Sequence, residues 1–487
     1  MHVPKVTAFL CALAALCGSL ALAPSAFASH DQIDFFEAPQ QLLNAAARPA
    51  AIAELQSLGV HAVRIQLIWD EVAPSPRSKK QPKLNLTNPA NYNWGQYAPL
   101  IQAMQTLGWK VLLTVTGYAP CWASECSKTK YTTRELVTDP NPGDYGQFMQ
   151  AVGREFGSYV KLYSVWNEPN QTQELEPQYL DGNPHKTLES AVIYRKLFLD
   201  GYAGLKQSGN FAGTKVLMGE TSPLGVTSVD ISPPLAFLRG VLCLNSHYVK
   251  ASSCGMLPAA GYAQHPYDQE QGPFWKPPTA FDGADDVTIA TLGQLQTALR
   301  LAADAHAIPR STPIYITEFG VQSYPNRYLG VPVAQQAEYD AIAERTAWND
   351  PDVASFSQYL LSDDPDPGDE GSFQTGLVYV GGKPKPLYNG YRLPLTVTVN
   401  GGSRVAFWGL VRPAAAAGPV VVQYSDNNGS SWQQLLTAQT NANGYWSASG
   451  LFDHQRVWRV QWTSPSGTVY AGAPVRAYVT GNPKPQS

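Results

Sequence analysis

Two glutamates stand directly after short apolar segments that read as β-strands. Glu168 follows the segment 162–166 with one residue between, and Glu318 follows the segment 314–317 at once. The carboxyl ends of parallel strands in a closed barrel meet at one face, so both side chains are expected at one site. Two carboxyl groups that flank a bond can protonate the leaving oxygen and attack, or activate water, which is the chemistry of glycosidic bond cleavage.

Each glutamate taken alone has a simpler interpretation as a solvated residue just past a strand. By average composition, the tripeptide Asn167-Glu168-Pro169 arises by chance in roughly one chain in twenty of this length. The tripeptide ends an apolar segment, and a second strand–glutamate unit follows downstream. This combination favours a functional pair over two unrelated surface residues.

The segments that must position the two glutamates alternate between strand and helix. Strands alternating with amphipathic helices predict parallel βαβ units, and eight of them favour a (β/α)8 TIM barrel, an α/β fold, over residues 29–393. An open doubly wound sheet is the alternative, but no glycine-rich phosphate loop follows any strand. The expected strands are residues 31–36, 62–69, 109–115, 162–166, 215–219, 260–265, 314–317 and 354–361, and the expected helices include 96–107, 143–156, 194–207, 287–307 and 334–348.

The pattern changes near Pro394 to short alternating segments separated by turns rich in Gly, Asn and Pro. It predicts a small all-β, immunoglobulin- or fibronectin-like sandwich over residues 394–487. Its tryptophans could form a carbohydrate platform, but alternation places most of them in the sandwich core, which favours a packing or spacer role. The expected strands are 395–400, 404–411, 420–424, 432–437, 445–448, 457–462 and 475–479, and the tryptophans are Trp408, Trp432, Trp446, Trp458 and Trp462.

The first residues read as a signal peptide. Lys5 precedes an apolar run over residues 6–23, Pro24 ends it, and Ala26-Phe27-Ala28 is a small-x-small cleavage pattern. We expect residues 1–28 to be removed and the product to be secreted and extracellular. A membrane anchor is the less favoured alternative, because the run is short and a cleavage pattern follows it. With 34 basic and 38 acidic residues, nothing in the charge indicates nucleic acid or an anionic membrane as a partner.

Four of the six cysteines lie beyond this leader, in two close pairs. Four cysteines allow three connectivities, and the sequence does not choose among them. An exported protein favours disulfides, and the close pairs lead us to expect Cys121–Cys126 and Cys243–Cys254. A metal site is the competing interpretation, but zinc-type spacing is absent and no histidine lies close by in the sequence. We expect no metal and no organic cofactor.

Both glutamate motifs resemble those of a known group of enzymes. Trp166-Asn167-Glu168-Pro169 resembles the fourth-strand signature of the clan-A retaining glycoside hydrolases, and Thr317-Glu318-Phe319-Gly320 resembles their seventh-strand nucleophile motif. The likeness extends to His265-Pro266-Tyr267 after the sixth strand and to Arg64 on the second. Within the clan, the chain is most similar to glycoside hydrolase families 39 and 5, which these residues do not separate.

The resemblance implies a role for each matching residue. Glu168 would be the general acid/base, Glu318 the nucleophile, and Asn167 a partner of the sugar 2-hydroxyl. Arg64 and Tyr267 would hold Glu318 ionised and aimed, and His265 would line the site. An arginine lowers the pKa of a neighbouring carboxyl group, and a less charged setting raises that of the other. Taken alone, Arg64 could equally be a structural ion pair, and His265 and Tyr267 could be core residues.

The chain departs from the clan at its eighth strand, which often ends in a tryptophan that stacks on the sugar. Here the strand ends Gln358-Tyr359-Leu360-Leu361, and Trp348 falls earlier on an expected helix. Tyr359 could form the platform, or a tryptophan from a neighbouring loop could do so; the candidates are Trp69, Trp122 and Trp275.

The substrate is therefore expected only as an oligosaccharide or polysaccharide, cleaved by a β-glycosidase or α-L-arabinofuranosidase type of activity. The sugar, the linkage, endo or exo action and the oligomeric state stay open. The alternatives are a catalytically silent carbohydrate-binding protein on the same barrel and a transglycosylase. The acidic run 363–370 could bind Ca²⁺ through oxygen ligands, but it lacks the EF-hand spacing, and a solvated loop is favoured.

Overall fold

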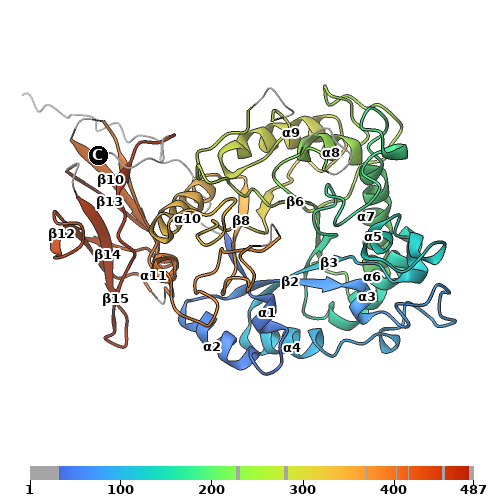
Figure 1. Cartoon of the computed structure of the whole chain (residues 1–487), viewed down its shortest axis with the longest axis horizontal. Helices are drawn as coiled ribbons and strands as arrows, with labels where there is room; N and C mark the ends of the chain where they lie inside the picture. The colour runs from blue at the N-terminus through green and yellow to red at the C-terminus, as the bar shows by residue number, and fades with distance from the viewer. Residues whose placement is uncertain are drawn as a thin grey trace, which may run out of the picture.

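The computed structural model of the chain describes residues 32–225, 231–278, 283–368, 371–401, 403–414, 416–451 and 456–481. The expected signal peptide and its cleavage site lie outside these ranges, as do residues 369 and 370 of the acidic run. Figure 1 shows a large ring of strands and helices with a smaller, all-strand part beside α10 and α11. Among the described residues, no helix combines the length and apolar character that crossing a membrane requires.

Eight parallel strands close into a barrel in the order of the sequence, so the predicted (β/α)8 fold is confirmed. Each strand begins and ends within two residues of its expected bounds, because uninterrupted apolar runs mark strands that are buried on both faces. The strands are β1 (Ile33–Glu37), β2 (Ala62–Ile68), β3 (Lys110–Thr116), β4 (Leu162–Val165), β5 (Lys215–Thr221), β6 (Gly261–Gln264), β7 (Ile314–Ile316) and β8 (Val353–Tyr359).

Helices cover the outside of the barrel. In α6, apolar residues recur every three or four positions and face inward, and the Asn141 side chain accepts a hydrogen bond from the Asp144 amide (3.0 Å) at the helix start. The helices are α1 (Pro39–Leu42), α2 (Arg48–Ser57), α3 (Trp69–Val72), α4 (Tyr97–Leu107), α5 (Thr133–Val137), α6 (Pro142–Phe156), α7 (Glu189–Gln207), α8 (Pro234–Val241), α9 (Leu292–Asp304), α10 (Val333–Trp348) and α11 (Pro386–Arg392).

Two helix bounds differ from expectation. The segment 287–307 contains a 3₁₀ turn (Ile289–Thr291) before α9, because Thr288 and Thr291 form a capping box there. Helix α7 begins five residues earlier than the expected start at residue 194, and its first turn is already buried through Ser190, Ala191 and Ile193. These differences leave the barrel order unchanged.

The inside of the barrel has an apolar layer below and a polar layer above. Because side chains alternate along a strand, residues two apart face the same side. Phe35 and Ala62 belong to the inner apolar cluster, and Glu37 and Arg64 lie two residues further along β1 and β2. The barrel therefore presents charged side chains at the carboxyl ends of its strands.

The C-terminal part consists of two four-stranded sheets that enclose one apolar core, so the predicted β-sandwich is confirmed. Trp408, Trp446, Trp458 and Trp462 are buried, while Trp432 is half-buried, which agrees with the packing interpretation. The strands are β9 (Leu395–Val399), β10 (Arg404–Gly409), β11 (Pro419–Ser425), β12 (Gln433–Gln439), β13 (Trp446–Leu451), β14 (Val457–Thr463), β15 (Val469–Ala471) and β16 (Ala477–Tyr478).

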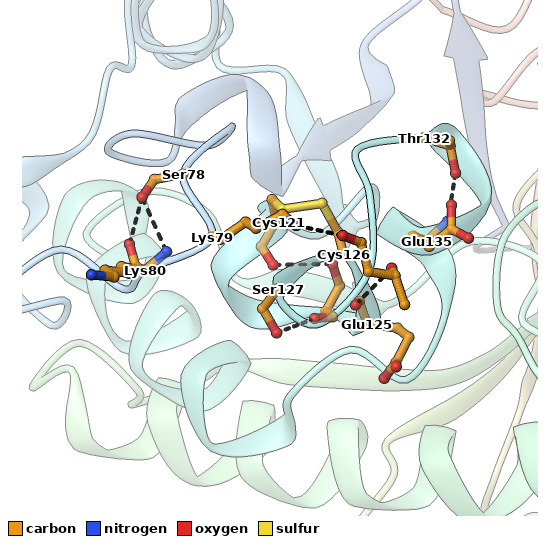
Figure 2. The surroundings of a disulfide bond; sticks show 11 residues. Ser78, Lys79, Lys80, Cys121, Glu125, Cys126, Ser127, Thr132 and Glu135 are labelled. Carbon is orange, nitrogen blue, oxygen red and sulfur yellow. Dashed lines mark hydrogen bonds between the residues drawn. A yellow bond between two sulfur atoms is a disulfide. The ribbon is translucent and has the colours of Figure 1, made fainter.

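The cysteines form two disulfides, Cys121–Cys126 and Cys243–Cys254, as the close pairs predict. Figure 2 shows the first, in the loop that follows β3. The backbone amide of Cys121 donates to the Pro76 carbonyl (2.7 Å), which ties this loop to the one after α3. Both pairs are used in disulfides, so the alternative that these cysteines bind a metal is wrong.

Arg412 joins the sandwich to the barrel. Its guanidinium pairs with Glu344 on α10 and donates to Asp34 on β1 (3.0 Å), and it lies 4.4 Å from the centre of the Tyr391 ring. Arg412 is 5% exposed and Glu344 is 3% exposed. A buried ion pair therefore crosses the boundary between the two parts.

Candidate active site

Arg64 is the centre of the charged layer. The guanidinium is buried, and one nitrogen, Nη1, donates to both oxygens of Glu37 (3.0 Å) and to Oε1 of Glu318 (2.5 Å). Its Nη2 donates to Oδ1 of Asn167 (2.8 Å) and to Oε2 of Glu220 (2.6 Å). Burial acts to lower the pKa of Arg64, but the surrounding carboxylates raise it well above its ordinary value. Arg64 thus binds side chains that lie at or just beyond the ends of four other strands.

Glu318 lies two residues beyond the end of β7 and is 5% exposed. Its Oε1 accepts from Arg64 and from Nε2 of Gln66 (3.2 Å), and its Oε2 accepts from the Tyr267 hydroxyl (3.0 Å). Tyr267 stacks on Phe319 with ring centres 6.2 Å apart. Both oxygens of the carboxylate are therefore held by donors from fixed elements.

Glu168 follows β4 on a tight turn of the backbone. Trp166 (φ 62°) and Glu168 (φ 35°) both adopt left-handed conformations, which cost free energy in non-glycine residues and cluster at functional sites. The Glu168 carboxyl contacts Nδ1 of His265 (2.9 Å) and accepts from Nε2 of Gln171 (2.6 Å). Burial raises its pKa above the ordinary value, against the opposing effect of His265.

The two glutamates face one another closely. One ligand atom each of Glu168, His265 and Glu318 lie within 4.8 Å of one another. Inverting glycosidases leave about 6.5–9.5 Å between their carboxyl groups for a water, whereas retaining enzymes have about 5–5.5 Å. The approach of the two carboxyl groups here is shorter than the inverting range and close to the retaining one.

Two further carboxyl groups belong to this cluster, and the sequence reasoning missed both. Glu220 on β5 accepts from Arg64 and contacts Nε2 of His265 (2.8 Å). Burial acts to raise its pKa, but Arg64 and His265 lower it to about 2. Glu37 ends β1, and there burial outweighs Arg64 and raises the pKa to about 8. The expected strands ended at residues 36 and 219, one residue short of each of these glutamates.

His265 lies between the carboxylates, with Nδ1 toward Glu168 and Nε2 toward Glu220. Burial acts to lower its pKa, but Glu318, Glu168 and Glu220 raise it to about 10. The imidazole is then doubly protonated at neutral pH. Glu168, His265 and Glu318 have the spacing of metal ligands, and a metal ion would have to displace a proton from His265 to bind there.

Asn167 is oriented by its neighbours. Its Oδ1 accepts from Arg64, its backbone amide donates to the Thr116 hydroxyl (2.9 Å), and its side chain hydrogen-bonds Glu174. Because Oδ1 of Asn167 accepts from Arg64, the side-chain nitrogen of Asn167 is the atom that faces Glu174. Burial and the charge of Glu168 raise the pKa of Glu174 to about 8.

The expected aromatic platform residues fall into two groups. Trp69 is fully buried and stacks on Phe148, so its proposed contact with sugar is wrong. Trp122 is 6% exposed, packs edge-on against Trp69 and donates to the Pro74 carbonyl (3.1 Å), so it too belongs to the core. Trp69 packs against Tyr145 and Phe148 of α6, a contact between distant segments that the sequence alone does not show.

Tyr359 and Trp275 remain candidates for sugar contact. Tyr359 ends β8, is half-buried and packs edge-on against Phe373 with ring centres 5.0 Å apart. Burial and the nearby charge of Glu318 raise its pKa well above the ordinary value, which places it beside the cluster. Trp275 is half-buried in the loop after β6.

No protein-family model and no curated protein matches this sequence. Similar solved structures include a glucosidase from Croceicoccus marinus, with 10% identity over 84% of this chain and 90% of that chain (TM-score 0.48). A GH113 beta-1,4-mannanase has 11% identity over 74% and 96% (TM-score 0.36), and a beta-D-glucuronidase of Dictyoglomus thermophilum has 11% over 75% and 50% (TM-score 0.38). Likenesses of this size assign no activity to this chain.

Proposed function

We propose that this chain is a secreted retaining glycoside hydrolase that cleaves O-glycosidic bonds of oligosaccharides or polysaccharides. The observation that carries the proposal is the pair of carboxyl groups, Glu168 after β4 and Glu318 after β7, within 4.8 Å of one another. Their surroundings differ. Arg64, Gln66 and Tyr267 hold Glu318, while burial raises the pKa of Glu168.

In the first step, Glu318 attacks the anomeric carbon and forms a covalent ester as the glycosidic C–O bond breaks. Glu168 transfers its proton to the leaving oxygen, so the leaving group departs as a neutral alcohol. A raised pKa suits Glu168 to this role, because the group must carry a proton at the start of the reaction. The imidazolium of His265 then stabilises the carboxylate that remains.

In the second step, Glu168 removes a proton from water, and the oxygen of that water attacks the anomeric carbon. Glu318 leaves as a carboxylate, and the sugar is released with its original anomeric configuration. We expect Asn167, whose Oδ1 accepts from Arg64, to donate from its amide nitrogen to the 2-hydroxyl of the sugar. No step requires a metal or organic cofactor.

The decisive experiment combines a substrate panel with stereochemistry. Aryl β-xyloside, β-glucoside, β-galactoside and α-L-arabinofuranoside are incubated with the protein beside soluble polysaccharides, and proton NMR identifies the first anomer formed. Retention is expected, and inversion would refute the mechanism. Binding without turnover across the panel would instead favour the carbohydrate-binding protein. Products elongated at high acceptor concentration would favour transglycosylation.

A further inference from the structure

A pocket of about 210 Å³ opens beside the carboxylate cluster, between the barrel and the helices outside it. Glu37, Arg64 and Tyr359 line it on the barrel side. Leu42, Leu43 and Leu100 are among the residues that line it on the helix side. The pocket therefore borders the carboxylate cluster through Glu37 and Arg64 and has aliphatic side chains on its other side.

The pocket exists because two neighbouring strands differ in length. Strand β1 ends at Glu37 and pairs with β2 only through Phe36 and Val63, whereas β2 continues to Ile68. Along its other edge β2 pairs with β3 over its whole length. The last residues of β2 consequently have no strand on the β1 side, and the amide of Ile68 donates to the Tyr97 hydroxyl instead (3.2 Å).

Aliphatic side chains line much of this gap. Leu42 and Leu100 are almost fully buried and Leu43 is half-buried, and Ile65 adds a further aliphatic surface. Polar side chains also line the pocket, but they are paired: Arg64 with Glu37, Gln66 with Glu318, and Tyr97 with Glu71. A sugar ring placed here would lose hydrogen bonds from its hydroxyl groups to water and would have to compete for these paired groups, which is costly. An acyl or alkyl group carries no such cost, and burying it contributes favourable free energy.

The position of the pocket indicates which part of the substrate enters it. Glu168 protonates the leaving oxygen, so the leaving group extends past β4, whereas β1, β2 and β8 form the pocket. Gln66 contacts Glu318 and also lines the pocket, so one side chain separates the nucleophile from this space. The sugar that Glu318 attacks therefore lies nearer to the pocket than the leaving group does.

Building on the proposed function, we propose that the pocket binds an apolar O-acyl or alkyl substituent on the sugar unit that becomes attached to Glu318. The preferred substrates are then glycosides whose non-reducing-side sugar is partly acylated or alkylated. Each methylene buried raises kcat/KM by about fourfold. A butyryl ester carries two more methylenes than the matching acetyl ester and should thus exceed it by about sixteenfold.

The test uses the 4-nitrophenyl glycoside that the panel identifies as a substrate, together with its mono-O-acetyl and mono-O-butyryl isomers. At least one butyryl isomer is expected to be cleaved about sixteenfold better than the matching acetyl isomer, and better than the parent. Leu43→Trp, which fills the pocket, should abolish this preference, and Leu43→Ala should shift it toward longer chains. Leu84→Trp is the matched control at a half-exposed leucine outside the pocket, and it should keep the wild-type ratio.

The proposal is overturned if no acyl isomer is preferred, if both Leu43 variants keep the wild-type ratio, or if the preference follows the alkyl length of the leaving group. Absence of hydrolysis of every parent glycoside would refute the proposed function instead. In that case thermal shifts with methyl O-butyryl glycosides test the pocket directly, and equal shifts for butyryl and parent glycosides would refute it.

Discussion

Arg64 and His265 lie among four carboxyl groups, which is more than two cations can neutralise. The surroundings of these carboxyl groups give them different pKa values. Glu220 lies between both cations and stays ionised, while Glu37 and Glu168 lie where burial outweighs attraction. Proton placement, rather than net charge, then distinguishes the residue that donates a proton from the one that attacks.

Glu168→Gln tests that distinction. We expect kcat/KM to fall by about 10²–10⁴-fold on substrates with poorly activated leaving groups, because these need a proton from Glu168. A dinitrophenyl glycoside, whose leaving group needs little protonation, should show a much smaller loss in the first step. Steady-state and burst kinetics on both substrates measure the difference. Glu155→Gln, at an exposed helical glutamate, is the control, and equal losses on both substrates would contradict the role.

The pH dependence of stability follows from the same groups. The folded pKa of His265 is raised to about 10 from 6.5, so its contribution is complete below pH 6.5 and is lost as the pH rises toward 10. The folded pKa of Glu37 is raised to about 8 from 4.5. Between pH 4.5 and 8 the unfolded chain releases this proton while the folded protein keeps it, so the stability that Glu37 contributes is lost as the pH rises through this range.

Both groups therefore predict a Tm that falls as the pH rises from 6.5 to 9. Differential scanning fluorimetry across this range measures the decline, and Glu37→Gln should make it shallower. On the acid side, the contribution of Glu220 is present above pH 4.5 and is lost as the pH falls toward 2, because its folded pKa is about 2. A Tm that stays constant or rises from pH 6.5 to 9 would contradict the assigned shifts.

The sequence predicted individual site residues when they stood in recognisable motifs at strand ends. Glu168, Glu318 and Asn167 do, and the structure brings them together with Arg64 and Tyr267. Glu220 was missed because Gly219 (φ 106°) introduces an irregularity that shifts β5 by one residue against β6. Strict alternation along β5 would not place Glu220 inside the barrel. The irregularity in the strand turns its side chain inward.

At the scale of elements, strands were easier to predict than the space between them. Apolar runs marked all eight barrel strands. Helices α2 and α8, which have a proline in the first turn but no side-chain cap, were among the helices not anticipated. The burial of Trp69 and the gap beside β2 depend on which helices pack on which strands. Such relations join segments far apart in the chain, so local patterns do not contain them.

The two disulfides offer a test at this scale. A cross-link stabilises mainly by restricting the unfolded chain, and the effect grows with the enclosed loop. The bonds enclose sequence separations of 5 and 11 residues. We expect Cys121→Ser/Cys126→Ser to lower the free energy of unfolding by about 2 kcal/mol and Cys243→Ser/Cys254→Ser by about 3 kcal/mol. Chemical denaturation of both double variants measures this, and the reverse order would contradict the loop-length argument.

At the scale of the whole molecule, the sandwich and the barrel share a buried ion pair. Arg412→Met would leave Glu344 buried without its cation, and breaking such a pair costs about 3–5 kcal/mol. We expect a clear fall in Tm, measured by scanning calorimetry, and one cooperative transition in the wild type. Arg404→Met, at an exposed position on β10, is the control and should change the free energy of unfolding by less than about 0.5 kcal/mol.

An Arg404 variant as harmful as the Arg412 variant would contradict this account, and so would separate melting of barrel and sandwich in the wild type. The boundary near residue 394 could be anticipated because the segment pattern changes there. The ion pair across it could not, since nothing local to Arg412 indicates its partners on α10 and β1.

The shared ion pair also limits how this gene can recombine. A barrel that receives a foreign sandwich keeps Glu344 and Asp34 but loses the guanidinium that neutralises them. A viable chimera must either supply an arginine at the equivalent turn or replace the two acids by neutral residues. We therefore expect the two acids and the arginine to be kept or lost together when domains recombine. The sandwich should not be exchanged independently of them.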